Sequence, residues 1–353
     1  MRTGVKRSLF AVVAVLIAVA VTTGVLLGVD VYLHGKYERS GGFNVWGYRG
    51  HSAGRKKPGE YRVVVLGGSS AYGYGVTADE ALPAVLERQL RMRTTSPAFT
   101  VINLGYNNEG AYSFRTTLED YRWLKYDLAI LYEGYNDMNP VGPNLTIFRH
   151  QSPVFRLTGY MPIFPIIFEE KSAVMLTGGD AGAFYRKDNK TVFHASLATR
   201  AGAGVLGATA DVARALEAQL GRVSAEPSHA VDSTATAGCS ARWGVYCHSM
   251  AVAIEYARQQ GAQVIVGGQP FLRVSFLHDM QAEQQTELRE MVKRRFGGDA
   301  AIRYVGLGDQ IDLENPKLAF DHMHLTEAGN RAAGALLVQP VLDMAAQKAP
   351  KTS

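Results

Sequence analysis

The stretch "VVVLGGSSAYGYGV", residues 63 to 76, indicates both how the chain folds and where its chemistry lies. It begins with the β-branched residues that are typical of a buried strand and then breaks into the small residues Gly67 to Ser70. In an open parallel sheet, ligands bind beyond the carboxyl ends of the strands. The stretch therefore predicts a strand over residues 62–66 and a functional loop directly after it.

Strands and amphipathic helices alternate along most of the chain after this stretch. Thr77 and Glu80 fit a capping box and predict a helix over residues 77–90, although Pro83 lies near its start. The other predicted helices cover residues 113–124, 205–220, 249–260, 280–296 and 326–346, and the other strands 99–104, 127–132, 264–266 and 302–305. This alternation predicts an α/β fold, a three-layer α/β/α sandwich around about five mainly parallel strands.

The N-terminal region is apolar enough to span a bilayer. Leu9 to Val29 is a run of 21 residues without a charge. Arg2, Lys6 and Arg7 precede it, so the positive-inside rule places the rest of the chain outside the cytoplasm. The alternative is a cleaved signal peptide with its cleavage site at Ala18–Ala20. We favour an uncleaved anchor in the cytoplasmic membrane, because the apolar run continues well past that site.

These features predict the organisation of the chain. An irregular insertion interrupts the α/β pattern and extends, with a Ser/Thr/Ala-rich loop, to the second cysteine. The predicted parts are a cytoplasmic N-terminus (1–8), a transmembrane anchor (9–29), a polar connector (30–60), an α/β domain (61–347) with its insertion at about 140–247, and a tail (348–353).

Charge and cysteine content narrow the choice of partners. The net charge is +5, but the basic residues are scattered and form no stripe that would follow a phosphate backbone, so nucleic acid is not a predicted partner. The only cysteines, Cys239 and Cys247, are close enough in sequence to form a loop disulfide in an oxidising compartment. Two unpaired thiols are the alternative, whereas zinc would need more ligands than these cysteines and His248 provide.

Candidate catalytic residues follow the strands or precede the last helix. They are Ser69, Gly105 in "NLGYNNEG", Asn136 in "EGYND", and Asp321 with His324 in "DHMHLTEAGN". Each taken alone fits a turn, a cap or a surface pair, but together they supply every part of acyl transfer. A serine needs an imidazole to take its proton, a carboxylate to orient that imidazole, and N–H donors to stabilise the anionic intermediate.

These residues resemble the sequence blocks of the SGNH, or GDSL-like, hydrolases. Gly67–Gly73 matches the first block, Gly105 the second-block glycine, Gly134–Asp137 the third block G-x-N-D, and Asp321–His324 the last block D-x-x-H. The resemblance covers residues 62–137 and 261–342. It implies a flavodoxin-like SGNH fold, with Ser69, His324 and Asp321 as the catalytic triad and with Ser69, Gly105 and Asn136 as the oxyanion hole.

The blocks also decide between neighbouring candidates. Ser69 is favoured over Ser70, which would shift the block by one residue, and His324 is favoured over His322 because only His324 has an aspartate three residues earlier. Asp137 is expected to orient the Asn136 loop. The match departs at Gly68, where many members of the family have aspartate, and at Ser70, where the motif has leucine.

The resemblance implies a membrane-anchored esterase that hydrolyses an acyl ester, such as an O-acyl group on a glycan or lipid, without metal or organic cofactor. One alternative is an O-acyltransferase that passes the acyl group to an envelope or exported polysaccharide. The second alternative is a non-catalytic, membrane-anchored binding protein with the same fold. The segment "NVWGYRG", Asn44 to Gly50, resembles one found in membrane-anchored bacterial members; we expect it to pack over the sheet edge or to border the cleft.

Overall fold

The computed structural model describes residues 2–39, 42–138, 147–176, 197–221 and 235–348 of the 353-residue chain. The chain divides into two compact units. Unit 1 consists of Met1–Tyr37, Val45–Gly47 and Arg149–Glu226, and unit 2 of Glu38–Asn44, Tyr48–Phe148 and Pro227–Ser353.

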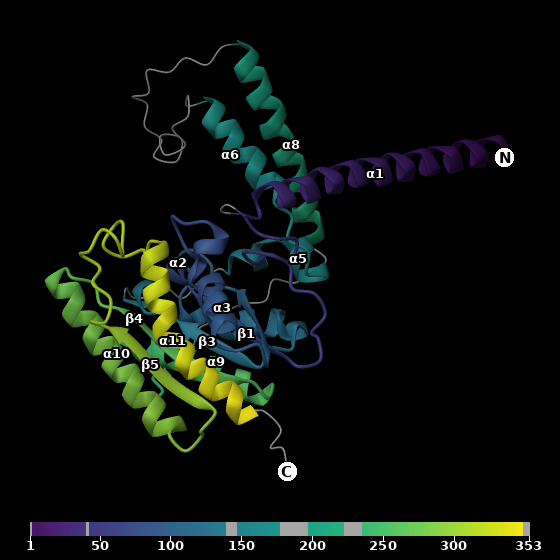
Figure 1. The fold of residues 1–353 in the computed structure, drawn as a ribbon. Helices are drawn as coiled ribbons and strands as arrows, with labels where there is room; N and C mark the ends of the chain where they lie inside the picture. Colours follow the sequence, from purple (N-terminus) through teal and green to yellow (C-terminus); the bar gives the residue numbers. More distant parts are fainter. Residues whose placement is uncertain (1, 40–41, 139–146, 177–196, 222–234, 349–353) are drawn as a thin grey trace. The chain divides into compact units, whose positions relative to one another are not determined.

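Unit 2 is built on a five-stranded parallel sheet (Figure 1). Its strands are β1 (Glu60–Gly67), β2 (Ala98–Asn103), β3 (Leu128–Tyr132), β4 (Gln263–Pro270) and β5 (Ile302–Gly308). The spatial order β2-β1-β3-β4-β5 is that of a flavodoxin-like sheet, in which the chain changes direction across the sheet between β1 and β3. The predicted α/β fold with five parallel strands is therefore confirmed.

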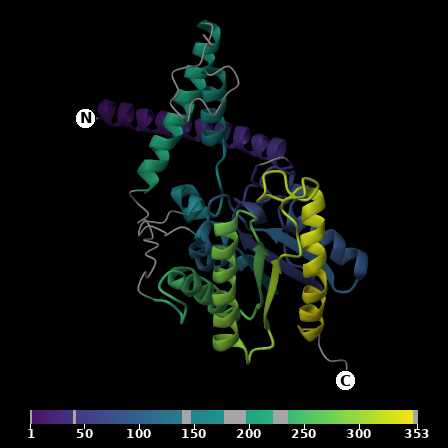
Figure 2. The ribbon, with the colours of Figure 1, turned by 90° about the vertical axis from the view of Figure 1, so that its left-hand side faces the viewer.

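Helices cover both faces of this sheet (Figure 2). Helices α3 (Leu82–Arg93) and α11 (Glu327–Lys348) pack together on one face. Helices α4 (Phe114–Asp120), α9 (Gly244–Gln259) and α10 (Ser275–Phe296) cover the other. Short helices occupy the connections: α2 (Ser69–Tyr72), η1 (Ala78–Glu80), η2 (Ala111–Ser113), η3 (Arg122–Leu124), η4 (Tyr135–Asp137) and η5 (Phe148–Gln151).

The apolar run Val63–Leu66 forms the centre of the core. Val63 and Val65 belong to the hydrophobic cluster that includes the inner faces of α3 and α11. Val64 and Leu66 point to the opposite face, because successive side chains of a strand alternate, and they are equally buried. A strand buried on both faces needs a continuous apolar sequence rather than an alternating one, which explains the run.

The predicted helix over residues 77–90 is wrong in its start. The capping box is present, with the Thr77 N–H donating to Glu80 Oε2 at 2.9 Å, but it caps only the short turn η1. Helix α3 begins at Leu82, with Pro83 in its first turn. Proline is tolerated there because the first N–H groups of a helix have no partner within the helix.

Unit 1 is mainly helical where the structure describes it, which corrects the prediction of an irregular insertion. Its helices are α1 (Arg2–Tyr37), α5 (Pro153–Thr158), α6 (Phe164–Leu176) and α8 (Leu197–Gly221). Helix α1 also continues past Val29 to Tyr37, so the first part of the predicted connector is helical. In this part of the helix the buried Asp30 accepts the N–H groups of Ile163 and Phe164 at 2.8 and 2.6 Å and so joins α1 to the start of α6.

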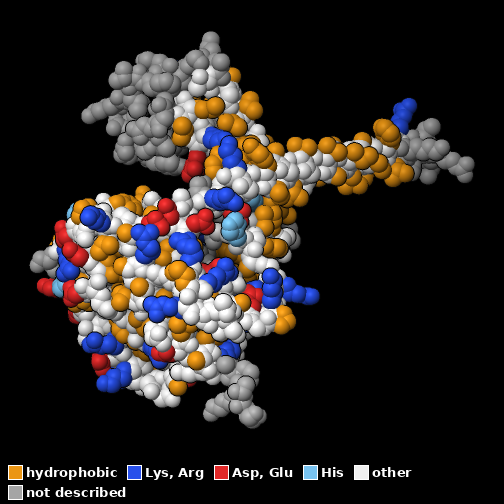
Figure 3. Space-filling model, in the orientation of Figure 1, with side chains coloured by type: hydrophobic (Ala, Val, Ile, Leu, Met, Phe, Trp, Pro, Cys, Tyr) orange, Lys and Arg blue, Asp and Glu red, His pale blue; other side chains and the backbone are white. Residues whose placement is uncertain are grey.

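Helix α1 is the one candidate membrane span among the described residues, by length and composition. Most of its apolar side chains are exposed along its length (Figure 3). A signal sequence near an N-terminus has the same properties, so the helix is an anchor or a signal.

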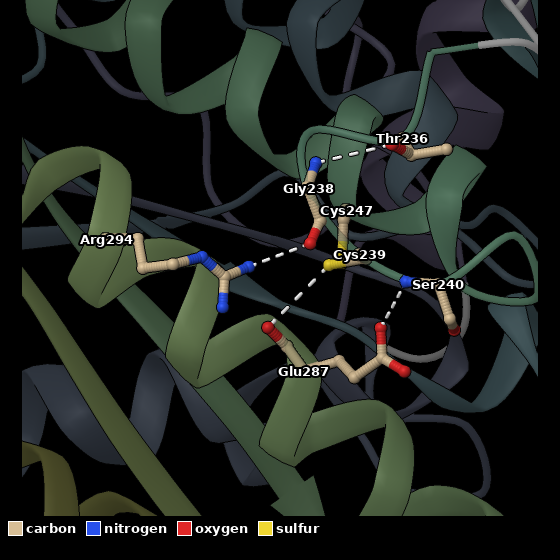
Figure 4. The surroundings of a disulfide bond; sticks show 7 residues. All are labelled: Thr236, Gly238, Cys239, Ser240, Cys247, Glu287 and Arg294. Carbon is tan, nitrogen blue, oxygen red and sulfur yellow. Dashed lines mark hydrogen bonds between the residues drawn. A yellow bond between two sulfur atoms is a disulfide. The ribbon is translucent and has the colours of Figure 1, made fainter.

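Cys239 and Cys247 form a disulfide in unit 2, at the start of α9. The surrounding loop is also held to α10 (Figure 4). Arg294 donates to the Gly238 carbonyl oxygen at 2.9 Å, and the Ser240 N–H donates to Glu287 Oε2 at 2.6 Å. The disulfide and these contacts together close the loop against two helices.

We expect the double substitution Cys239→Ser, Cys247→Ser to lower the free energy of unfolding by roughly 2–3 kcal/mol, because a short loop gains conformational freedom in the unfolded chain. Urea denaturation of the purified protein measures this change. Adding reductant to the native protein should reproduce the loss, and reductant should leave the double variant unchanged. Two thiols that alkylate freely in the unreduced, denatured protein would contradict the pairing.

Candidate active site

The loop after β1 places Ser69 at the carboxyl edge of the sheet. Strand β1 ends at Gly67 and the short helix α2 begins at Ser69. The Gly68 N–H donates to the carboxylate of Glu133, the residue that follows β3. A Cβ atom on Gly68 would collide with Glu133 Oε2 and with the side-chain amide of Asn136. Only glycine fits here, because neighbouring side chains fill the space that an aspartate of the GDSL motif would occupy.

Three of the predicted residues lie in hydrogen-bond contact. His324 Nε2 lies 2.8 Å from Ser69 Oγ, and His324 Nδ1 lies 2.6 Å from Asp321 Oδ2. In the tautomer with its proton on Nδ1, His324 donates to Asp321 and accepts the Ser69 hydroxyl proton. This is the arrangement that activates a serine for nucleophilic attack.

The turn before α11 fixes the histidine. Asp321 Oδ1 accepts the N–H groups of Met323 and His324 at 3.1 and 2.7 Å. Burial alone would raise the pKa of Asp321, but these hydrogen bonds and the one from the His324 ring outweigh it and hold the pKa below its usual value. Asp321 is therefore ionised at neutral pH, as a carboxylate that orients and stabilises an imidazolium must be.

The neighbouring candidates, Ser70 and His322, do not take part in this hydrogen-bonded group. The Ser70 hydroxyl is buried and has no hydrogen-bond partner among the described residues. His322 lies on an exposed turn, with its ring 3.5 Å from the surface residue Glu314. Neither side chain makes a hydrogen bond to Ser69 or His324 among the described residues, which agrees with the preference for Ser69 and His324.

The structure does not support Gly105 as an oxyanion donor. Its N–H donates to Asn103 Oδ1 at 3.0 Å, and a Cβ on Gly105 would press against the Tyr72 backbone of α2. Gly105 therefore allows close packing behind α2. The sequence match fails here because the loop contains a second glycine, Gly110, and spacing alone did not distinguish the two.

Asn136 lies beside the nucleophile loop, as predicted. Its side-chain amide donates to the Glu109 carbonyl oxygen at 3.0 Å. That oxygen would in turn contact a Cβ on Gly68, so the peptide between Glu109 and Gly110 lies against the start of the Ser69 loop. Among the described residues, neither the Ser69 N–H nor the Gly110 N–H has a hydrogen-bond acceptor.

Two buried carboxyl groups support this region, and of these only Asp137 was expected to do so. Glu133 Oε1 accepts the N–H groups of Gly134 and Asn136 at 2.9 and 3.1 Å, in addition to the Gly68 bond of Oε2. Asp137 accepts the Ala111 N–H at 2.9 Å. Burial raises the pKa of Glu133 to about 7, and burial with the nearby Glu133 raises that of Asp137 well above its usual range. The position of Glu133 directly after a strand was the available sequence signal.

The segment "NVWGYRG" also stabilises the helix that begins with Ser69. The buried Arg49 donates to the carbonyl oxygens of Tyr72 and Gly73 at 2.6 Å, and its backbone pairs with Asn103 at the edge of β2. Asn103 also donates to the Tyr72 carbonyl oxygen, at 3.1 Å. Arg49 thus packs on the sheet edge, as expected, and also holds the end of the helix that begins with Ser69.

The comparisons with known proteins find similar solved structures at low sequence identity. No family model and no curated protein matches the sequence. Similar solved structures include the family 3 carbohydrate esterase of Clostridium thermocellum (11% identity, TM-score 0.43, 82% of this chain and 100% of that chain). Another is a lipolytic protein of the G-D-S-L family from Veillonella parvula (11%, 0.42, 79% and 97%). The function proposed below rests on the side chains of this chain and not on these similarities.

We expect Glu133→Gln to lower kcat by about 10- to 100-fold with little change in KM. Glutamine has one acceptor oxygen, so a buried N–H of the loop loses its partner at a cost of roughly 1–3 kcal/mol. Steady-state kinetics on a p-nitrophenyl ester measures the effect.

The raised pKa of Glu133 also means that the free energy of unfolding of the native protein should fall as pH rises from 4.5 to about 7, and Glu133→Gln should weaken this dependence.

Glu87→Gln is the matched control for the kinetic effect. Glu87 is a half-buried carboxylate that accepts the Val101 N–H at 2.6 Å, within α3 and away from the loop. The control should lose stability and keep its kcat. Equal losses of kcat in both variants would show that Glu133 acts only through general stability.

Proposed function

We propose that the chain is an SGNH-type serine esterase that hydrolyses an acyl ester through an acyl-serine intermediate. The observation that supports this most is the continuous contact from Ser69 Oγ through the His324 ring to Asp321, at 2.8 and 2.6 Å. These residues are separated by up to 255 positions in sequence and meet where the fold places ligands.

The proposed reaction has two halves. His324 takes the hydroxyl proton as Ser69 Oγ attacks the ester carbonyl carbon, and the resulting tetrahedral intermediate carries its negative charge on the former carbonyl oxygen. The carbon–oxygen bond to the alcohol then breaks, and His324 Nε2 gives its proton to the departing oxygen. Water attacks the acyl-serine in the second half, His324 takes one of its protons, and the acid leaves as Ser69 regains a proton.

The Ser69 N–H, the Gly110 N–H and the Asn136 side-chain amide are the proposed oxyanion donors. The amide has two N–H bonds, and its bond to the Glu109 carbonyl oxygen uses one of them. Gly110 takes the place assigned to Gly105, because the Gly105 N–H is already engaged. Backbone N–H groups without an acceptor beside a nucleophile suit this role, since they are oriented before the charge develops and need no reorganisation.

We expect Ser69→Ala, His324→Ala and the double variant to lose similar amounts of activity, each by about 10⁴-fold or more, because these residues act as a unit. Asp321→Ala should lose less. The native activity should rise between about pH 6 and 8, since only neutral imidazole accepts the serine proton. Initial rates on acetyl, butyryl and long-chain p-nitrophenyl esters measure these effects.

A fluorophosphonate probe provides the control for this mechanism. It should label the native protein on the peptide that contains Ser69 and should fail to label Ser69→Ala. A label on Ser70 would move the nucleophile by one residue. Full esterase activity in Ser69→Ala would refute the mechanism.

We also propose that α1 anchors the enzyme in the cytoplasmic membrane, with the catalytic unit outside the cytoplasm. The exposed apolar side chains of α1 and the three basic residues before its apolar run support this orientation. A C-terminal alkaline phosphatase fusion should therefore be active and should sediment with membranes. A processed protein released in full would show that the segment is a signal peptide.

A further inference from the structure

Two exposed aromatic rings border the catalytic histidine. Tyr74 is 50% exposed and Phe320 is 47% exposed. The Tyr74 and Phe320 ring centroids lie 4.8 and 5.9 Å from that of His324 and 6.4 Å from each other, and the Phe320 ring is stacked on the imidazole. Solvent-exposed aromatic groups that gather at one point of a surface are typical of a binding site.

Both rings are tied to the catalytic residues through the backbone. The Tyr74 N–H donates to the Ser69 carbonyl oxygen at 3.0 Å, and the Phe320 N–H donates to the His324 carbonyl oxygen at 3.1 Å. Gly75 has a φ of +81°, and a Cβ atom there would overlap the Phe320 ring. The backbones that carry the two rings are therefore held to Ser69 and His324, so less conformational freedom is lost when a ligand stacks on the rings.

The chemistry decides which part of an ester reaches these rings. His324 must hand its proton to the departing alcohol oxygen, so the alcohol portion lies on the His324 side of the reacting carbon. The carbonyl oxygen turns toward the oxyanion donors, around Ser69 and Asn136. Rings that flank the imidazole therefore face the alcohol portion rather than the acyl chain.

We propose that Tyr74 and Phe320 form the subsite for the alcohol portion of the substrate and that they select an alcohol that contains a six-membered ring with a face able to stack. The inference rests on the proposed esterase function. Stacking on two aromatic faces rewards a sugar ring, through its apolar C–H face, or an aryl ring, and gives an open-chain alcohol no comparable contact.

Acetate esters that differ only in their alcohol test the proposal: a mono-O-acetylated methyl glucopyranoside, benzyl acetate and hexyl acetate. All three release alkyl alcohols, so the chemical step changes little among them. We expect Tyr74→Leu and Phe320→Leu each to lower kcat/KM for the ring esters by about 3- to 10-fold and hexyl acetate by less than about twofold. A larger loss for the glucoside identifies a sugar as the preferred ring, and a larger loss for the benzyl ester an aryl group.

Trp123→Leu is the matched control, because Trp123 is 44% exposed and lies before β3, near the amino ends of the strands and not at their carboxyl ends. It should leave all three rates unchanged. Equal losses for ring and hexyl esters in the Tyr74 and Phe320 variants would overturn the subsite. A loss that instead follows acyl length, measured with benzyl acetate, butyrate and hexanoate, would do the same.

Fluorophosphonate labelling separates this outcome from failure of the proposed function. Undiminished labelling of Ser69 in both leucine variants, without a change in ring preference, would overturn the subsite alone. A native protein that is not labelled and hydrolyses none of the esters would refute the esterase function, and the subsite with it.

Discussion

The active site depends on one buried carboxylate, that of Glu133. It accepts the Gly68 N–H from the loop after β1 and the Gly134 and Asn136 N–H groups from the turn after β3. Strands β1 and β3 are neighbours at the point where the chain reverses the direction in which it adds strands, so the loops after them lead to opposite sides of the sheet and leave room for a ligand. Glu133 therefore joins the loop that carries Ser69 to the turn that carries Asn136.

Helix α2, which begins with Ser69, needs contacts from residues outside the helix to keep its backbone in place. It has four residues, too few for a helix that is stable by itself, and its final carbonyl groups have no partner within the helix. Arg49 and Asn103 donate to them instead, and both come from the edge of the sheet at β2. A segment that precedes the α/β pattern in the sequence therefore stabilises the backbone that begins with Ser69.

The sequence was most informative where a function depends on neighbouring residues. The Asp321 and His324 turn is local, since the carboxylate binds backbone and ring within three residues, and its spacing predicted it. The sequence could not choose between Gly105 and Gly110, because two glycines share one loop and only the Asn103 contact shows that the Gly105 N–H is engaged. The supports Arg49 and Glu133 act on loops distant in sequence, so composition and spacing gave no sign of their partners.

The two halves of the site differ in exposure, and the difference fits the direction of the reaction. The half formed by Gly68, Glu133 and Asn136 is largely buried and densely hydrogen-bonded, which suits donors that must not move as charge develops. The half formed by Asp321 and Phe320 is open, with 39% of the Asp321 side chain exposed. In the proposed reaction, the alcohol would depart on the open side, where His324 lies, and water would enter from the same side to release the acid. A site that is rigid around the oxyanion and open around the base permits both steps without a change of fold.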